Sequence, residues 1–350
     1  MDTLRWALTG SDGGLRAGWR LVAHAALMVA ALVVGVVGAL VLAVAASMLA
    51  GGEPGPVGTT ALYALSTTWL CVGLIAAHAV SGWVIDARWV GGFQRGKIRY
   101  SALGGPAGRA ALEGLGGVAM GLAALAVAVA IVAMAGIEVT AELLDARRFA
   151  GFLLGSALLI PAAAVEELLF RGYGFLWAGR CLAGVLSLVL VHVSTTHARR
   201  LANIGGFGTV IVATATAFGL VHGMNPGVTL LSTANTVLAG LWFGVLVVRT
   251  RTLWVAIGAH WSWNWAQGLL LGLPISGTTE DSSGLVLTPL ARTLVTAEPE
   301  WLSGGAYGIE GSIATSVAMV IAIAISAVLP SRAADNGASA LRWPPPTPGD

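Results

Sequence analysis

Long apolar runs, separated by short polar or turn-rich stretches, make up most of this chain. Most of them approach or exceed the length of about 20 residues that a helix needs to cross the hydrocarbon core of a bilayer. They begin near residues 21, 60, 114, 151, 207, 228, 253 and 312, and a shorter run covers 181–195. The pattern predicts an all-α fold, a polytopic transmembrane helix bundle with eight or nine membrane segments.

The same pattern divides the chain into six segments. They are a cytoplasmic N-terminal tail (1–19), N-terminal transmembrane helices (20–149), a central core (150–272), a polar loop (273–311), a last transmembrane helix (312–330) and a C-terminal tail (331–350). The last segment is polar and rich in proline, which predicts disorder.

Composition agrees with a membrane protein. Hydrophobic residues make up 56% of the chain and charged residues only 10%, whereas soluble domains carry about 25% charged residues. The net charge of +2 is too small to indicate a nucleic-acid partner. Lys and Arg concentrate in the N-terminal tail and in the loop 85–109, so the positive-inside rule predicts a cytoplasmic N-terminus. Without an organelle signal, we expect a prokaryotic plasma membrane, with lipid as a constant partner.

The run 181–195 leaves the topology open. If it crosses the membrane, Arg249 and Arg251 lie outside and the acidic segment 273–311 lies inside. If it does not cross, Arg249 and Arg251 lie inside and the acidic segment lies outside, as the positive-inside rule favours. The helices must then be broken at more points for the candidate site residues to meet. Both alternatives remain at this stage.

The first cluster of candidate functional residues is Glu166, Glu167 and Arg171, since ionisable groups within membrane segments are costly and often functional. Glu167 and Arg171 are spaced i, i+4, so they can form an ion pair on one helix face. Glu166 points about 100° away and is left free to act as a general base. The alternative is a pair of glutamates solvated at a helix end.

Two further clusters combine histidine with a partner four residues away. Phe218 and His222 share one helix face, although a lone histidine near a helix end is often only interfacial. His260 and Asn264 share another face of an apolar, tryptophan-rich run. Unpaired polar groups are costly in hydrocarbon, so this pair predicts a shared polar cavity.

Other polar residues carry weaker signals. His24 and His78 lie in the first two spans and suit packing or hydrogen bonds between helices. Glu310 precedes the last span, where it suits a helix cap or a position at the outer mouth of a cavity.

Glu166-Glu167…Arg171, Phe218…His222 and His260…Asn264, in this order in apolar segments, resemble the signature of the CPBP family (CAAX prenyl protease 2 and bacteriocin-processing, or Abi, membrane peptidases). The resemblance covers about residues 150–272, which would form the peptidase core. The stretch 181–206 departs from the family pattern because it makes the interval between Arg171 and His222 longer.

The resemblance implies roles for these residues. Glu166 would activate a water with the help of His222, and His260 and Asn264 would stabilise the oxyanion. Glu167 and Arg171 would support the site. A second interpretation of the family is a metalloprotease, in which Glu166, His222 and His260 would hold zinc. The chain lacks a His-Glu-x-x-His helix, so we favour the metal-independent route.

The resemblance thus implies an intramembrane endopeptidase acting on a peptide, a lipidated protein or a membrane-protein segment. One alternative is a non-catalytic membrane scaffold or bacteriocin self-immunity protein on the same fold. Another is a proton-relaying transporter, but the chain shows no pair of repeated halves with broken helices.

Overall fold

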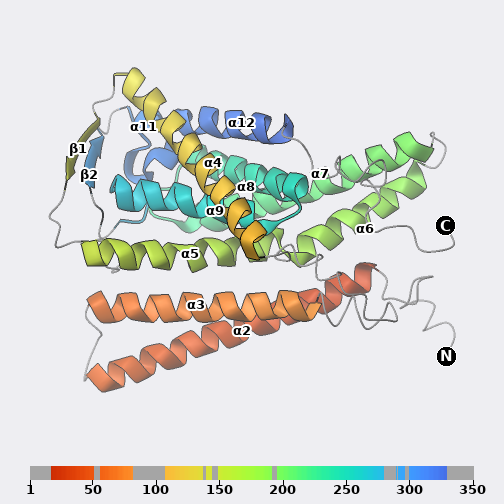
Figure 1. The fold of residues 1–350 in the computed structure, drawn as a ribbon, viewed down its shortest axis with the longest axis horizontal. Coiled ribbons are helices and arrows are strands. Elements are labelled where there is room, and N and C mark those ends of the chain that lie inside the picture. The colour runs from red at the N-terminus through yellow and green to blue at the C-terminus, as the bar shows by residue number, and fades with distance from the viewer. Residues whose placement is uncertain are drawn as a thin grey trace.

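The computed structural model describes residues 17–50, 56–81, 107–136, 139–143, 149–190, 195–279, 289, 291–295 and 299–328. Within these residues, nine α-helices of 13 or more residues form a bundle, joined by one pair of short strands (Figure 1). The predicted helical bundle is confirmed, and the small sheet is an addition. Predictions for most of the N-terminal tail, for the basic loop over 82–106 and for the C-terminal tail lie outside the described residues.

Five stretches are long and apolar enough to cross a membrane by length and composition. They are Leu21–Leu42, Ala107–Met134, Gly151–Leu186, Arg200–Met224 and Leu230–Thr250, with shorter apolar helices at Leu65–Val80 and Ile313–Val328. Large apolar side chains remain exposed along many of these helices, as expected where lipid is the solvent. The protein is therefore an integral membrane protein.

Helices α2 (Ala17–Ala50) and α3 (Pro56–Val80) form an antiparallel pair along one side of the bundle (Figure 1). Helix α4 (Ala107–Met134) crosses the opposite part of the bundle at an angle. Its glycines allow close contact with α9 (Leu253–Trp265), because a Cβ at Gly117 would collide with the backbone carbonyl of Val255. Small residues permit this approach of two helix backbones in membranes.

In the middle of the chain, the observed helices do not have the same bounds as the apolar runs of the sequence. Helix α5 (Phe149–Arg171) ends at Gly172, and α6 (Tyr173–Val189) begins immediately after it. The run predicted over 151–178 is therefore two helices, and most of 181–195 is the second half of α6. A Cβ at Gly172 would collide with the His78 ring of α3, so this break is a point of close packing.

Helix α6 continues in the general direction of α5, and α7 (Thr195–Val221) returns beside it (Figure 1). Residues 181–189 thus belong to α6 and are not a helix of their own, which favours eight membrane segments over nine. Helices α8 (Leu230–Thr250), α9 and α12 (Ile313–Val328) complete the bundle. The start of α2, the turn between α8 and α9 and the end of α12 lie on the same side. The cytoplasmic location of that side stays a prediction.

The other side carries the strands and short turns. Strands β1 (Val139–Leu143) and β2 (Ala291–Val295) pair antiparallel, with Val139 opposite Val295. A π-helical turn (Ala266–Leu270) ends the α9 run, and α11 (Glu300–Ser303) with two 3-10 turns, Gly305–Tyr307 and Ile309–Gly311, leads into α12. These turns bring the segment before α12 against the helices that carry the candidate site.

Candidate active site

Glu167 and Arg171 form the ion pair that their spacing predicts. Arg171 Nη1 donates to Glu167 Oε1 over 3.0 Å, and neither side chain is exposed. A buried charge is strongly destabilising unless it is paired and hydrogen-bonded. The pair therefore fixes both side chains at the last turn of α5.

Aromatic rings surround the Arg171 guanidinium. Its Cζ lies 4.5 Å from the centroid of Phe218 on α7, 5.5 Å from Phe170 and 5.6 Å from Phe243 on α8. A cation over an aromatic face is attracted by the ring quadrupole, more strongly when water is excluded. Arg171 thus joins three helices and places Phe218, one turn before His222, against α5.

Glu167 has a second partner that its helix position did not reveal. The same Oε1 atom lies 3.0 Å from Nδ1 of His260 on α9. A carboxylate accepts at this contact, so Nδ1 of His260 donates, and Nε2 is left facing Glu166. The ring also stacks on Phe243, with centroids 5.0 Å apart. Glu167 therefore orients His260 as well as neutralising Arg171.

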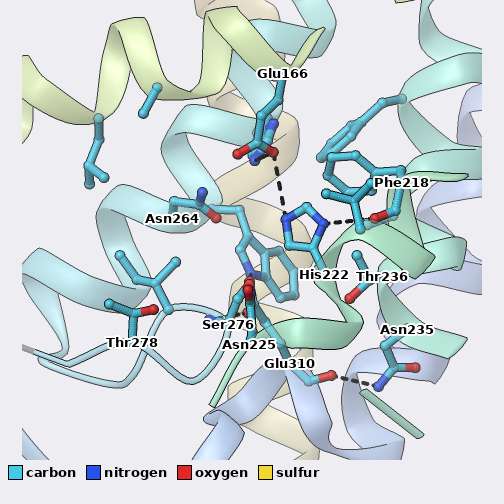
Figure 2. Close-up of a pocket in the computed structure, with 18 of the residues that line it drawn as sticks. Glu166, Phe218, His222, Asn225, Asn235, Thr236, Asn264, Ser276, Thr278 and Glu310 are labelled. Atoms are coloured by element: carbon cyan, nitrogen blue, oxygen red, sulfur yellow. Dashed lines mark hydrogen bonds and ion pairs between the residues drawn. The ribbon is translucent and has the colours of Figure 1, made fainter. Parts of the chain in front are cut away.

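His222 is oriented by the backbone of its own helix. Its Nδ1 atom lies 2.8 Å from the carbonyl oxygen of Phe218. The residue begins a 3-10 turn, His222–Met224, where α7 ends. Because Nδ1 donates to this carbonyl, Nε2 is directed toward Glu166 (Figure 2).

Glu166 faces the two histidines. Its Oε2 atom lies 3.8 Å from Nε2 of His222 and 3.8 Å from Nε2 of His260. The Glu166 side chain is 35% exposed, whereas Glu167 is fully buried. The two adjacent glutamates thus have different environments, as the helix geometry predicts.

These residues line a cavity of about 640 Å³. Asn264 also lines it, and Figure 2 shows its side chain near Glu166. All four predicted catalytic residues, Glu166, His222, His260 and Asn264, are therefore brought together on one cavity from α5, the end of α7 and α9. The polar residues that complete the lining are Tyr63, Asn225, Asn235, Thr236, Ser276, Thr278, Glu310 and Thr315.

The predicted zinc alternative requires Glu166, His222 and His260 as ligands. One Glu166 oxygen does approach both Nε2 atoms, as a catalytic zinc site would need. However, among the described residues no three His, Cys, Asp or Glu side chains are arranged to hold a metal ion. Zinc binding by these three side chains stays a prediction.

Glu310 is a second carboxylate in the cavity. Its Oε2 atom accepts from the Ser276 amide over 2.6 Å and from the Ser276 hydroxyl over 2.7 Å, and Oε1 accepts from Trp263 Nε1 over 3.1 Å. Burial raises the pKa of the Glu310 carboxyl, while the bonds from Ser276 act in the opposite direction. Glu310 therefore lies in the cavity lining, bound to Ser276 and Trp263.

Sequence reasoning did not include Glu310 or Ser276 among the site residues. The available signal was an acidic residue just before an apolar run, which is also typical of a helix cap. Asn235 was not singled out either, although its amide donates to the backbone carbonyls of Glu310 and Ser312 over 2.7 and 2.8 Å. These contacts join segments that lie far apart along the chain.

The comparison with protein families decides what this site resembles. Residues 148–266 match the family model described as type II CAAX prenyl endopeptidase Rce1-like. The predicted family resemblance is confirmed over this segment. It covers about a third of the chain and contains every predicted site residue. No curated protein and no solved structure matches the chain.

The Rce1-like segment ends at Ala266, within the turn that follows α9. The helices α2, α3, α4 and α12 and the residues Ser276 and Glu310 lie outside it. The Rce1-like segment therefore supplies Glu166, His222, His260 and Asn264 to the cavity. The remainder of the chain supplies Ser276 and Glu310.

Proposed function

We propose that this protein is a membrane endopeptidase that hydrolyses a peptide bond with a water activated by Glu166 and His222. The observation that carries the proposal is the approach of one Glu166 oxygen to Nε2 of both histidines, at 3.8 Å each, on a cavity that the Rce1-like segment lines in part. Proton acceptors, hydrogen-bond donors and space for a substrate thus meet at one place.

The proposed reaction begins with a water between Glu166 and the substrate carbonyl. The water oxygen attacks the carbonyl carbon while its proton passes to Glu166. His260 and Asn264 stabilise the oxyanion, with Asn264 donating from its amide and His260 from its imidazolium form. The proton then passes to the leaving nitrogen as the C–N bond breaks, which leaves one carboxyl and one amino terminus.

Glu167 and Arg171 are positioning residues in this scheme. Glu167 holds Nδ1 of His260, so that Nε2 faces the reaction. Arg171 neutralises Glu167, and both are fully buried. We expect the substrate to be a peptide, a lipidated protein or a membrane-protein segment, because the cavity lies among membrane helices.

The test compares peptide termini in membranes that carry equal amounts of wild type, Glu166→Gln or Glu166→Ala. Termini present only with the wild type would identify both the activity and a substrate. Identical profiles, in cells that express candidate substrates, would favour the scaffold or immunity function instead.

The same membranes can separate the two mechanisms. Treatment with a zinc chelator should leave the wild-type termini unchanged if Glu166 acts without a metal. Loss of cleavage on chelation, with recovery on adding zinc, would contradict the metal-independent mechanism and assign Glu166, His222 and His260 to zinc.

A further inference from the structure

Glu310 places a second carboxylate in the cavity, opposite Glu166. In Figure 2, Glu166 and Glu310 lie on opposite sides of the His222 ring, and both line the cavity. Glu310 and its partner Ser276 come from the chain after residue 266, outside the Rce1-like segment. This carboxylate is therefore a feature of the present chain that the family match does not assign.

Glu310 is held in place by donors on several elements. Ser276 binds Oε2 through both its amide and its hydroxyl, and the Trp263 indole binds Oε1. Asn235 of α8 holds the backbone carbonyl of Glu310, and Ser316 Oγ donates to Asn235 Oδ1 over 2.6 Å. Such a set of contacts preorganises the carboxylate. A carboxylate oxygen can accept two hydrogen bonds, and Oε1 accepts one here.

No described Lys or Arg lines this cavity, although two carboxylates do. The nearby Arg171 guanidinium is paired with Glu167 and is fully buried. The two histidines approach Glu166, which lies opposite Glu310 in the cavity. The cavity thus carries two carboxylates, and its basic lining side chains are the two histidines, which act electrostatically on Glu310 as well as on Glu166. An acidic cavity attracts cationic groups and repels anionic ones.

We propose that Glu310 determines substrate specificity by binding a cationic group of the substrate, either a Lys or Arg side chain or a terminal amine. This inference rests on the proposed peptidase function. A charge-assisted hydrogen bond to a fixed carboxylate is among the stronger polar contacts. A substrate that places a free carboxylate beside Glu310 is disfavoured by the same charge.

The test uses synthetic peptides of one apolar host sequence, with and without a farnesylated cysteine, in which a single Lys, Gln or Glu is moved along the chain. Binding is measured on purified Glu166→Gln protein, which should not cleave the peptides. At one position we expect Lys to bind about tenfold more tightly than Gln, and Glu more weakly than both. Adding Glu310→Gln should abolish this order, while the control Glu300→Gln, at an exposed residue of α11, should not.

Cleavage by the wild type is measured on the same peptides. Glu310→Gln should raise KM for the preferred Lys peptide about tenfold, whereas Glu300→Gln should not. Thermal unfolding in detergent shows whether the Glu310→Gln protein is folded. Equal binding of Lys, Gln and Glu peptides at every position, or no binding at all, would overturn the role of Glu310. A Lys preference in binding without any cleavage would instead count against the peptidase function alone.

Discussion

Two pairs of histidines in this bundle have similar local contacts and different surroundings. His222 and His260 lie at the cavity, whereas His24 and His78 lie where α2 and α3 meet the break between α5 and α6. In all four rings Nδ1 has a partner within the protein, at 2.7 to 3.0 Å. The local contacts of the rings therefore do not distinguish the two pairs.

The difference lies at the other ring nitrogen. Nε2 of His222 and of His260 faces the Glu166 carboxylate at the cavity. Nε2 of His78 instead lies against Gly172, and the His24 ring packs on Tyr173 with centroids 4.7 Å apart. A histidine within the membrane can take part in chemistry only where a carboxylate and a substrate can reach it. Elsewhere it joins helices.

The largest expected effect separates the two pairs directly. His222→Gln should lower the rate of cleavage by about 10²–10⁴-fold, because it removes a partner of the general base. It should hardly change the melting temperature, since the only bond lost within the described residues is a part-buried one to the Phe218 carbonyl. His24→Gln should destabilise the protein while each folded molecule keeps its activity. The measurements are cleavage rate and thermal unfolding in detergent, and equal activity losses in both variants would remove the distinction.

Arg171→Ala tests the ion pair with Glu167, the residue that binds His260. Removing the guanidinium leaves Glu167 as an uncompensated buried charge, so we expect a loss of about 3–5 kcal/mol in unfolding free energy. The matched control is Arg109→Ala, which breaks the i, i+4 pair with Glu113 at 3.1 Å, where the Arg109 side chain is 56% exposed. A smaller loss is expected there. Equal losses in denaturant unfolding would show that burial of the Arg171 pair is not decisive.

Gly172→Ala tests the packing of the His78 ring. The backbone at Gly172 is extended, with φ −72° and ψ −151°, so alanine fits the conformation, but its Cβ would collide with the His78 ring and with the Leu168 carbonyl. We expect a loss of about 1–3 kcal/mol from overpacking. Gly184→Ala on α6 is the control, because a Cβ there meets no atom within 4 Å. Thermal unfolding of both variants provides the comparison, and a stable Gly172→Ala would show that the ring can move away.

Ser81→Ala should have the smallest effect. The Ser81 hydroxyl donates to the Ala77 carbonyl and therefore accepts from His24 Nδ1, each over 2.7 Å. Losing this acceptor should cost about 1 kcal/mol, the usual net contribution of a hydrogen bond. Cleavage should be unchanged. A fall in activity without a fall in stability would mean that the distant histidine pair influences the site.

Local spacing in the sequence predicted much of the site. Glu167 and Arg171 form their ion pair, Glu166 is directed elsewhere, and the three motifs line one cavity. The apolar runs predicted the helices except near Gly172, where one run contains two helices. Hydropathy has no signal for that break, because both helices are apolar and the close packing at Gly172 involves the His78 ring of another helix.

The sequence by itself determined the membrane environment, the helical bundle and the i, i+4 relations, because these follow from composition and from neighbours along one helix. Only the tertiary structure decided that Glu167 also holds His260, which is 93 residues away, and that Glu310 meets Trp263, which is 47 residues away. Helix periodicity orients a side chain relative to its own helix axis. Which other helix it meets depends on how the whole bundle packs, and that packing turns four separate polar residues into one site.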